Sequence, residues 1–126
     1  MAGERVLIIE DNEKNMKLVR DILQAMGYSP LEAFTGEQGL ALAAENDPAL
    51  VLMDIQLPDL DGAEALRRLR SDERTAGIPV LALTAQAMQG DRERFLAAGF
   101  DGYLSKPVDV DELLETVRRY CDGGTE

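Results

Sequence analysis

Histidine is absent from this sequence of 126 residues, and cysteine occurs once, at Cys121. The lack of histidine excludes imidazole metal ligands, a Ser-His-Asp triad and a phosphohistidine within the chain. One cysteine cannot form an internal disulfide bond. No apolar run approaches the ~18 residues of a membrane-spanning helix, and the N-terminal MAGER leads directly into a strand pattern, unlike a signal peptide. We therefore expect a cytoplasmic protein.

Basic residues are also few, with 13 Lys and Arg against 24 Asp and Glu, which gives a net charge of −11. This excess of negative charge argues against binding to a nucleic-acid backbone or to an anionic membrane. Hydrophobic residues make up 45% of the chain, enough for a core, and the length fits one compact domain. We predict a single domain over residues 1–126, with its core at about 5–120 and a short flexible tail at 122–126.

Apolar, strand-like runs alternate with amphipathic helix patterns along the chain. The strands are predicted at residues 5–9, 28–34, 50–53, 80–83 and 102–105. The helices are predicted at 13–26, 35–46, 61–71, 88–98 and 109–120, with Asn12, Thr35 and Asp109 as capping residues. On a period of 3.6 residues, the first helix presents one apolar face formed by Met16, Val19, Ile22, Leu23 and Met26.

This alternation is typical of an α/β fold with a parallel sheet. The strand runs at 5–9, 50–53 and 80–83 are the most apolar, so we place them at the centre of the sheet. We predict a doubly wound five-stranded parallel sheet in the order 2-1-3-4-5, with five helices, as in flavodoxin-like folds.

The stretch LVLMDIQLPDLDG, residues 50–62, indicates where the functional site lies. Its apolar run ends at Asp54, and in an open parallel sheet ligands bind at the carboxyl ends of the strands. Asp54 could also simply cap the following turn.

Other strand ends carry polar residues as well: Glu10 and Asp11 follow the first strand, Thr84 ends the fourth, and Lys106 follows the fifth. Three carboxylates close together repel one another, so they need cations. Lys106 supplies one charge, and an oxygen-preferring ion such as Mg²⁺ would supply the rest. A carboxylate can accept a phosphoryl group. Taken singly, Thr84 could instead cap the next helix and Lys106 could be a surface lysine.

Four motifs stand in one order along residues 5–120: VLIIEDN, LVLMDIQLPDLDG, VLALTAQA and GYLSKPV. In these motifs the chain resembles the receiver domains of two-component response regulators, the class of CheY. The stretches EDNEKNMKLV, LMDIQLP and LTAQAMQGD are similar to single-domain regulators of the DivK type. Receivers fused to histidine kinases carry such stretches too, so a receiver taken from a larger hybrid kinase or regulator stays an alternative.

The resemblance implies a role for each matching residue. Asp54 matches the phosphoacceptor, Asp11 a direct ligand of Mg²⁺ or Mn²⁺, and Glu10 a ligand acting through water. Glu10 departs from an Asp-Asp pair, and its longer side chain could alter the metal geometry. The backbone carbonyl of Gln56 matches the third protein ligand.

Three further positions match the switch machinery of these domains. Thr84 matches the hydroxyl that follows the phosphoryl group, and Lys106 matches the site lysine, with a cis bond expected between Lys106 and Pro107. Tyr103 matches the switch aromatic, although a half-buried strand residue would look the same.

The resemblance also implies protein partners, and the net charge of −11 argues against nucleic acid and membrane as partners. A histidine kinase or phosphotransfer protein would dock at Lys14 and Leu18 on the first helix, and a downstream protein target would bind a face with Arg92, Arg94 and Tyr103. Leu18 could instead belong to the core, and the arginines could be solvated. Such a domain is no enzyme beyond its own Asp phosphorylation and dephosphorylation.

Two other classes of function use similar elements. A small Mg²⁺-dependent phosphohydrolase of the haloacid dehalogenase type places a second Asp two residues after the nucleophile, where this chain has Gln56, and a capping domain does not fit in 126 residues. A binding module is the other class. A flavin carrier would need a phosphate-cradling loop where the anionic EDNEKN stands, and a receiver that has lost phosphorylation would lack key residues that are present here.

Overall fold

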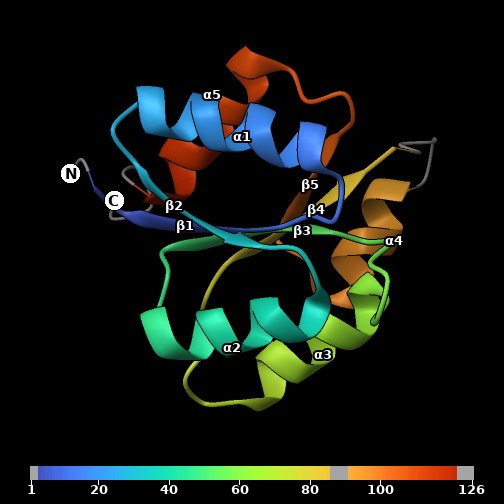
Figure 1. The fold of residues 1–126 in the computed structure, drawn as a ribbon. Helices are drawn as coiled ribbons and strands as arrows, with labels where there is room; N and C mark the ends of the chain where they lie inside the picture. Colours follow the sequence, from blue (N-terminus) through green and yellow to red (C-terminus); the bar gives the residue numbers. More distant parts are fainter. Residues whose placement is uncertain (1–2, 86–90, 122–126) are drawn as a thin grey trace.

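The computed structural model describes residues 3–85 and 91–121, which form a sheet with helices on both faces (Figure 1). The five strands of this part of the chain are β1 (Arg5–Ile9), β2 (Ser29–Ala33), β3 (Leu50–Asp54), β4 (Val80–Thr84) and β5 (Gly102–Ser105). The helices are α1 (Glu13–Ala25), α2 (Gly36–Asn46), α3 (Gly62–Ser71), α4 (Asp91–Ala98) and α5 (Val110–Cys121).

The strands are all parallel and stand in the order β2-β1-β3-β4-β5. Helices α1 and α5 lie on one face of the sheet, and α2 and α3 lie on the other (Figure 1). The predicted α/β class and strand order are therefore confirmed.

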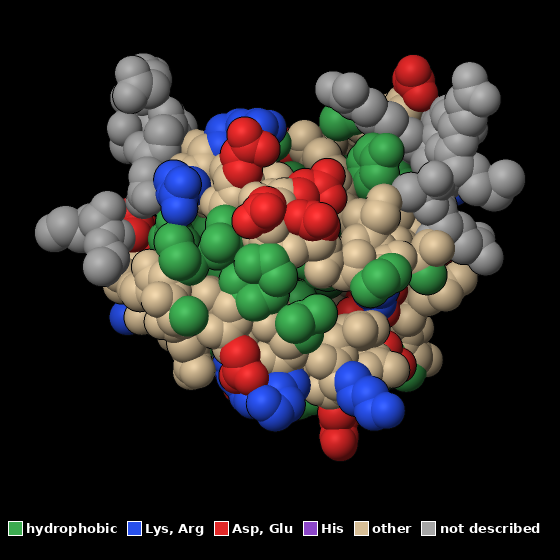
Figure 2. All heavy atoms as spheres, turned by 90° about the horizontal axis from the view of Figure 1, so that it is seen from above, with side chains coloured by type: hydrophobic (Ala, Val, Ile, Leu, Met, Phe, Trp, Pro, Cys, Tyr) green, Lys and Arg blue, Asp and Glu red, His purple; other side chains and the backbone are tan. Residues whose placement is uncertain are grey.

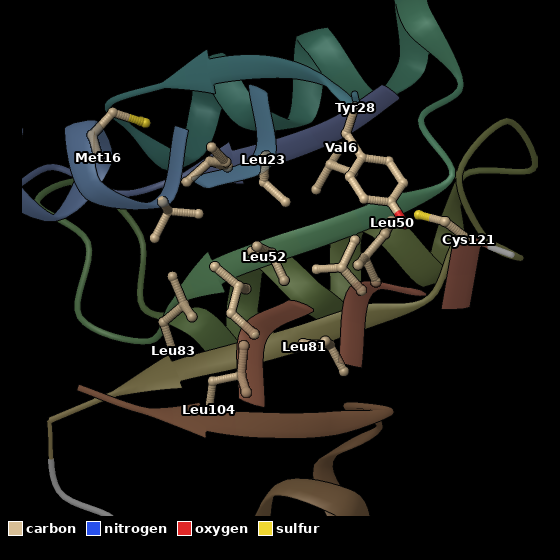
Figure 3. Packing of buried hydrophobic residues seen from close by; sticks show 14 residues of the cluster. Val6, Met16, Leu23, Tyr28, Leu50, Leu52, Leu81, Leu83, Leu104 and Cys121 are labelled. Atoms are coloured by element: carbon tan, nitrogen blue, oxygen red, sulfur yellow. The ribbon is translucent and has the colours of Figure 1, made fainter. Parts of the chain in front are cut away.

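The sheet is buried on both faces because its central strands are apolar at successive positions. Every residue of β3 and β4 is buried. The core under α1 and α5 is drawn in Figure 3, where side chains of α1 face those of the strands: Met16 and Leu23 from α1, and Val6, Leu50, Leu52, Leu81 and Leu83 from the sheet. A second cluster, which includes Phe95 of α4, packs Leu66 and Leu69 of α3 on the opposite face.

The helix starts follow the capping residues of the sequence. The side chains of Asn12, Thr35 and Asp109 each accept a hydrogen bond from a backbone N–H three residues later, at 2.9 to 3.1 Å. Asp61 does the same for α3. These bonds satisfy donors that a helix N-terminus leaves free.

The prediction that Met26 belongs to the buried face of the first helix was wrong. Met16, Val19 and Leu23 are buried, but Met26 is 40% exposed. Helix α1 ends at Ala25, and the chain turns at Gly27, whose φ is +90°. Met26 therefore lies beyond the last helical residue, where the period of 3.6 no longer applies.

Most other element boundaries agree with the prediction to within one residue. Strand β2 is shorter than 28–34 at both ends, and Tyr28 packs into the core just before it. The predicted start of the fourth helix at Met88 and the predicted tail at 122–126 lie outside the described residues. No helix within residues 3–85 and 91–121 combines the length and the apolar character that a membrane crossing requires.

Candidate functional site

The carboxyl ends of four strands meet at one edge of the sheet. Ile9 pairs with Met53, Asp54 with Leu83, and Thr84 with Ser105, so these strand ends are nearly level. This register brings together the side chains that the sequence predicts for the site, since each stands at a strand end or within two residues after one.

Three carboxylates gather at this edge, as the sequence predicts. One oxygen from each of Glu10, Asp11 and Asp54 lies within 4.8 Å of the others. Glu10 is fully buried and Asp54 is nearly so, whereas Asp11 is exposed. We call these three residues the acidic cluster.

Lys106 brings a positive charge to the cluster from the far side of β4. Its Nζ lies 2.8 Å from Asp54 Oδ2 and 2.6 Å from Glu10 Oε1. The lysine side chain is only 14% exposed, so these ion pairs are screened little by water. One ammonium thus contacts the two buried carboxylates and leaves an excess of negative charge.

Burial and pairing change the acid–base properties of this edge. Desolvation raises the pKa of Glu10 above its ordinary value of 4.5, against the opposing effects of Lys106 and of the Asn12 N–H. For Lys106, desolvation lowers the pKa, but the hydrogen bonds to Asp54 and Glu10 together outweigh it, so the pKa is raised. The hydrogen bonds thus favour the charged form of Lys106, whereas burial disfavours the ionised form of Glu10.

The turn after β3 begins with a hydrogen bond to the side chain of the phosphoacceptor candidate, Asp54. Asp54 Oδ1 accepts the backbone N–H of Gln56 at 2.9 Å, so Asp54 does cap a turn as well as belonging to the acidic cluster. The N–H of Gly62 donates to the Ile55 carbonyl at 2.9 Å and closes the loop that carries Gln56.

Thr84 lies beside Asp54 and Lys106. The three residues share the wall of a pocket of about 80 Å³ with Ile55, Gln56 and Ala85. Thr84 is buried, and its carbonyl accepts the Lys106 N–H at 2.7 Å. Ile55 and Ala85 were not among the predicted site residues, because aliphatic neighbours of a polar residue give no chemical signal in the sequence.

The other predicted positions lie on β5, directly after it, and on α1. The Lys106–Pro107 bond is cis. Tyr103, on β5, is half-buried, and its ring centroid is 5.6 Å from that of Phe95 on α4. On α1, Lys14 and Leu18 are exposed and belong to no part of the acidic cluster.

Two arginines were predicted on the face around Tyr103. The guanidinium of Arg94 stands 5.4 Å from the ring centroid of Phe95. The side chain of Arg92 lies outside the described residues.

The donor set fits a hard divalent cation. Carboxylate and carbonyl oxygens are the ligands that Mg²⁺ takes in proteins, and a site with few carboxylates leaves room for bound water. Asp11 offers an exposed carboxylate, and Glu10 and Asp54 have one counter-charge between them in Lys106. An ion here would relieve both the mutual repulsion and the desolvation of Glu10.

Comparison with known proteins identifies the family. The model of the response regulator receiver domain matches residues 6–118. The polar-differentiation response regulator DivK of Brucella ovis is 48% identical over 115 residues, covering 91% of this chain and 94% of that protein.

Two solved structures share the fold and part of the sequence. The receiver domain of a sensor histidine kinase from Pseudomonas aeruginosa PAO1, solved with magnesium in its active-site cleft, is 38% identical, with a TM-score of 0.86 over 95% of this chain and 98% of that one. The receiver domain of Ssk1 from Saccharomyces cerevisiae, solved with the histidine phosphotransfer protein Ypd1, is 29% identical, with a TM-score of 0.85 over 95% and 90%. This chain belongs to the response regulator receiver domain family of two-component signalling.

Proposed function

We propose that this chain is a phosphorylation-dependent switch. Asp54 accepts a phosphoryl group from a histidine kinase or a histidine phosphotransfer protein, and the signal leaves through contact with another protein. The observation that carries the proposal is the pairing of Asp54 with Lys106 at 2.8 Å, beside Thr84 and two further carboxylates. A role in capping the turn does not explain why a lysine, a threonine and two further carboxylates surround Asp54.

The chemistry of the transfer follows from these contacts. A carboxylate oxygen of Asp54 forms a bond to phosphorus while the bond from phosphorus to the donor breaks, which gives an acyl phosphate and the free donor. Lys106 and the Thr84 hydroxyl stand where the added negative charge of the phosphoryl oxygens develops. The chain is thus a self-modifying switch, with no reaction carried out on a third molecule.

Asp11, Glu10, Asp54 and the Gln56 carbonyl would hold Mg²⁺ or Mn²⁺. When bound, the ion neutralises the acidic cluster so that an anionic phosphoryl group can approach an anionic nucleophile. Asp11 suits direct ligation because its carboxylate is exposed. Glu10 suits an outer position, because Lys106 contacts Oε1 and the Asn12 N–H donates to Oε2 at 3.1 Å.

Phosphorylation of Asp54 reaches the protein surface through Thr84 and Tyr103. Once Asp54 carries phosphate, the Thr84 hydroxyl moves toward a phosphoryl oxygen, and Tyr103 turns inward into the space released. Tyr103 already contacts Phe95 of α4, so its rotation changes the surface formed by α4, β5 and α5. That surface is the proposed binding site of the downstream protein target.

Acetyl phosphate tests the proposed chemistry without any partner protein. The chain should gain the mass of one phosphoryl group in the presence of Mg²⁺ and should gain none when a chelator removes the metal. Intact-protein mass spectrometry measures both. An unchanged mass under both conditions, or equal labelling with and without metal, would contradict the proposal.

The phosphodonor must reach Asp54, and the helices nearest that edge offer an apolar surface. Seen from the side of α1 and α5, the molecule has hydrophobic side chains gathered beside acidic ones (Figure 2). Leu18 on α1 is 38% exposed, and Val110 at the start of α5 is 46% exposed. The structure of Ssk1 with Ypd1 supports a histidine phosphotransfer protein as one class of partner.

A double variant, Lys14→Glu with Leu18→Asp, should slow phosphoryl transfer from a cognate phosphohistidine protein by at least about tenfold, since two to three kcal/mol is typical for a lost interface anchor. Labelling by acetyl phosphate should stay near normal, because neither side chain belongs to the acidic cluster. Radiolabel transfer and intact mass measure the two rates. If both rates fell equally, the substitutions would have damaged the site or the fold, and docking on α1 would be wrong.

A further inference from the structure

The loop of residues 55–61 carries the Gln56 carbonyl, and its two ends are fixed close to the acidic cluster. Asp54 Oδ1 accepts the Gln56 N–H, the Ile55 carbonyl accepts the Gly62 N–H, and Gln56 bridges to Asp61. These contacts fix the base of the loop. They do not involve its tip, residues 58–60.

Asp59 holds that tip against a helix from another part of the chain. Its Oδ1 accepts the backbone N–H of Gly36 at 2.8 Å, and its Oδ2 accepts that of Glu37 at 2.9 Å. Both amides belong to the first turn of α2, where N–H groups have no partner within the helix. Thr35 caps the next amide, that of Gln38.

The neighbouring residue adds a steric contact at the same point. A Cβ on Gly36 would stand 2.9 Å from Leu60 Cδ1, so Leu60 packs directly on the backbone of α2. The loop tip and the start of α2 thus fit together closely, and a side chain at position 36 would require Leu60 to shift.

The contact is made by an ionised carboxylate. The hydrogen bonds from Glu37 and Gly36 lower the pKa of Asp59 below its ordinary value of 3.8, so the side chain is charged at neutral pH. A negative charge at a helix N-terminus is also favoured by the helix dipole. Both oxygens are used, which fixes the orientation of the carboxylate as well as its position.

We propose that Asp59 is a positioning residue for the metal site: by anchoring the loop tip to α2, it holds the Gln56 carbonyl in place for a divalent cation. The inference rests on the proposed function, in which Gln56 is a ligand of Mg²⁺. Asp59 itself is not one of the three carboxylates of the acidic cluster. A ligand on a loosely held loop must be ordered on binding, and that cost lowers the affinity.

Thr35 provides a matched control. Thr35→Ala removes a capping bond from the same helix end but leaves both loop contacts of Asp59 in place. Asp59→Ala removes the loop contacts and leaves the Thr35 cap. Asp59→Asn keeps one acceptor oxygen, so its loop should be held to α2 less firmly than in the unaltered chain and more firmly than in Asp59→Ala. Comparing these variants distinguishes an effect of lost helix capping at α2 from an effect of lost loop anchoring.

The test is the dissociation constant for Mg²⁺ alone, measured by calorimetry on the full chain, together with the urea midpoint of each variant. Asp59→Ala should weaken Mg²⁺ binding about tenfold, the lower end of what the loss of an outer-shell partner costs a metal site. Asp59→Asn should weaken it less. Thr35→Ala should leave the dissociation constant unchanged, although both Ala variants should lower the urea midpoint.

The possible outcomes separate this inference from the function on which it rests. If the unaltered chain bound no Mg²⁺, the metal site would be refuted, and the role of Asp59 with it. If the unaltered chain and Asp59→Ala bound Mg²⁺ equally, Asp59 would be a helix cap only, while the metal site would stand. Equal weakening by Thr35→Ala would likewise overturn the positioning role, since it would trace the effect to α2.

Discussion

Asp54→Asn should abolish the phosphorylation of the chain by acetyl phosphate. The change keeps the size and shape of the side chain, and the remaining oxygen can still accept a hydrogen bond from Lys106 or from the Gln56 N–H. An amide oxygen is not a nucleophile toward phosphorus under these conditions, so the reaction has no acceptor. We expect a labelled fraction at background level, against near-complete labelling of the unaltered chain, as read by intact-protein mass.

The other carboxylates serve as internal controls for this result. Glu10 and Asp11 lie within the same acidic cluster and are unchanged in the variant. A circular dichroism spectrum matching that of the unaltered chain would show that the fold is retained. Labelling of Asp54→Asn at the level of the unaltered chain would place the phosphoryl group on another residue and would refute Asp54 as the acceptor.

Asp11→Asn should weaken Mg²⁺ binding by more than about tenfold, and more than Glu10→Gln does, because a direct ligand counts for more than an outer one. The two oxygens of Glu10 are already engaged by Lys106 and by the Asn12 N–H, whereas Asp11 is exposed and available. A Mg²⁺ titration of the two variants measures the difference. A larger loss in Glu10→Gln would reverse the assignment of direct and outer ligand.

Neither of the same two variants should lose stability when the metal is removed by a chelator, as measured by the free energy of unfolding in urea. Burial raises the pKa of Glu10 in the folded chain. The contribution of Glu10 to the free energy of unfolding is therefore fully present below the ordinary pKa of 4.5 and is lost as the pH rises through the raised pKa. Ionised Glu10 therefore costs free energy at neutral pH, and Glu10→Gln should leave the free energy of unfolding unchanged or raise it. Asp11→Asn should change it little, because Asp11 is exposed.

Much of the fold could be predicted because local signals and burial agree along this chain. The runs that became β1, β3 and β4 are apolar at successive positions, which identifies buried parallel strands. The register of a parallel sheet then brings the strand ends together without further information. For this reason the acidic cluster and its lysine could be proposed from residue order alone.

The missed features depend on contacts between residues far apart in the sequence. The pairing of Asp59 with Gly36, for example, joins a loop to a helix start 23 residues earlier. No period or motif encodes such a bond. Met26 was misplaced because of a local pattern: the helical period was extended one residue past the end of α1.

The most direct test of the switch is the set of backbone amide shifts in the ¹⁵N spectrum of the chain before and after phosphorylation by acetyl phosphate with Mg²⁺. A two-state change needs only about 3 to 6 kcal/mol of differential interaction, which a phosphoryl group bonded to Thr84 and Lys106 can supply. Thr84→Ala keeps Asp54 and Lys106 but lacks the hydroxyl, so it serves as the matched control.

The proposed switch predicts shifts that extend beyond Asp54 into α4, β5 and α5, including Tyr103 and Phe95. These shifts should be smaller in Thr84→Ala when the two proteins are compared at the same phosphorylated fraction. Shifts confined to the residues around Asp54, or to the face of α2 and the outer edge of β2, would contradict it. So would an identical pattern of shifts in the Thr84→Ala variant.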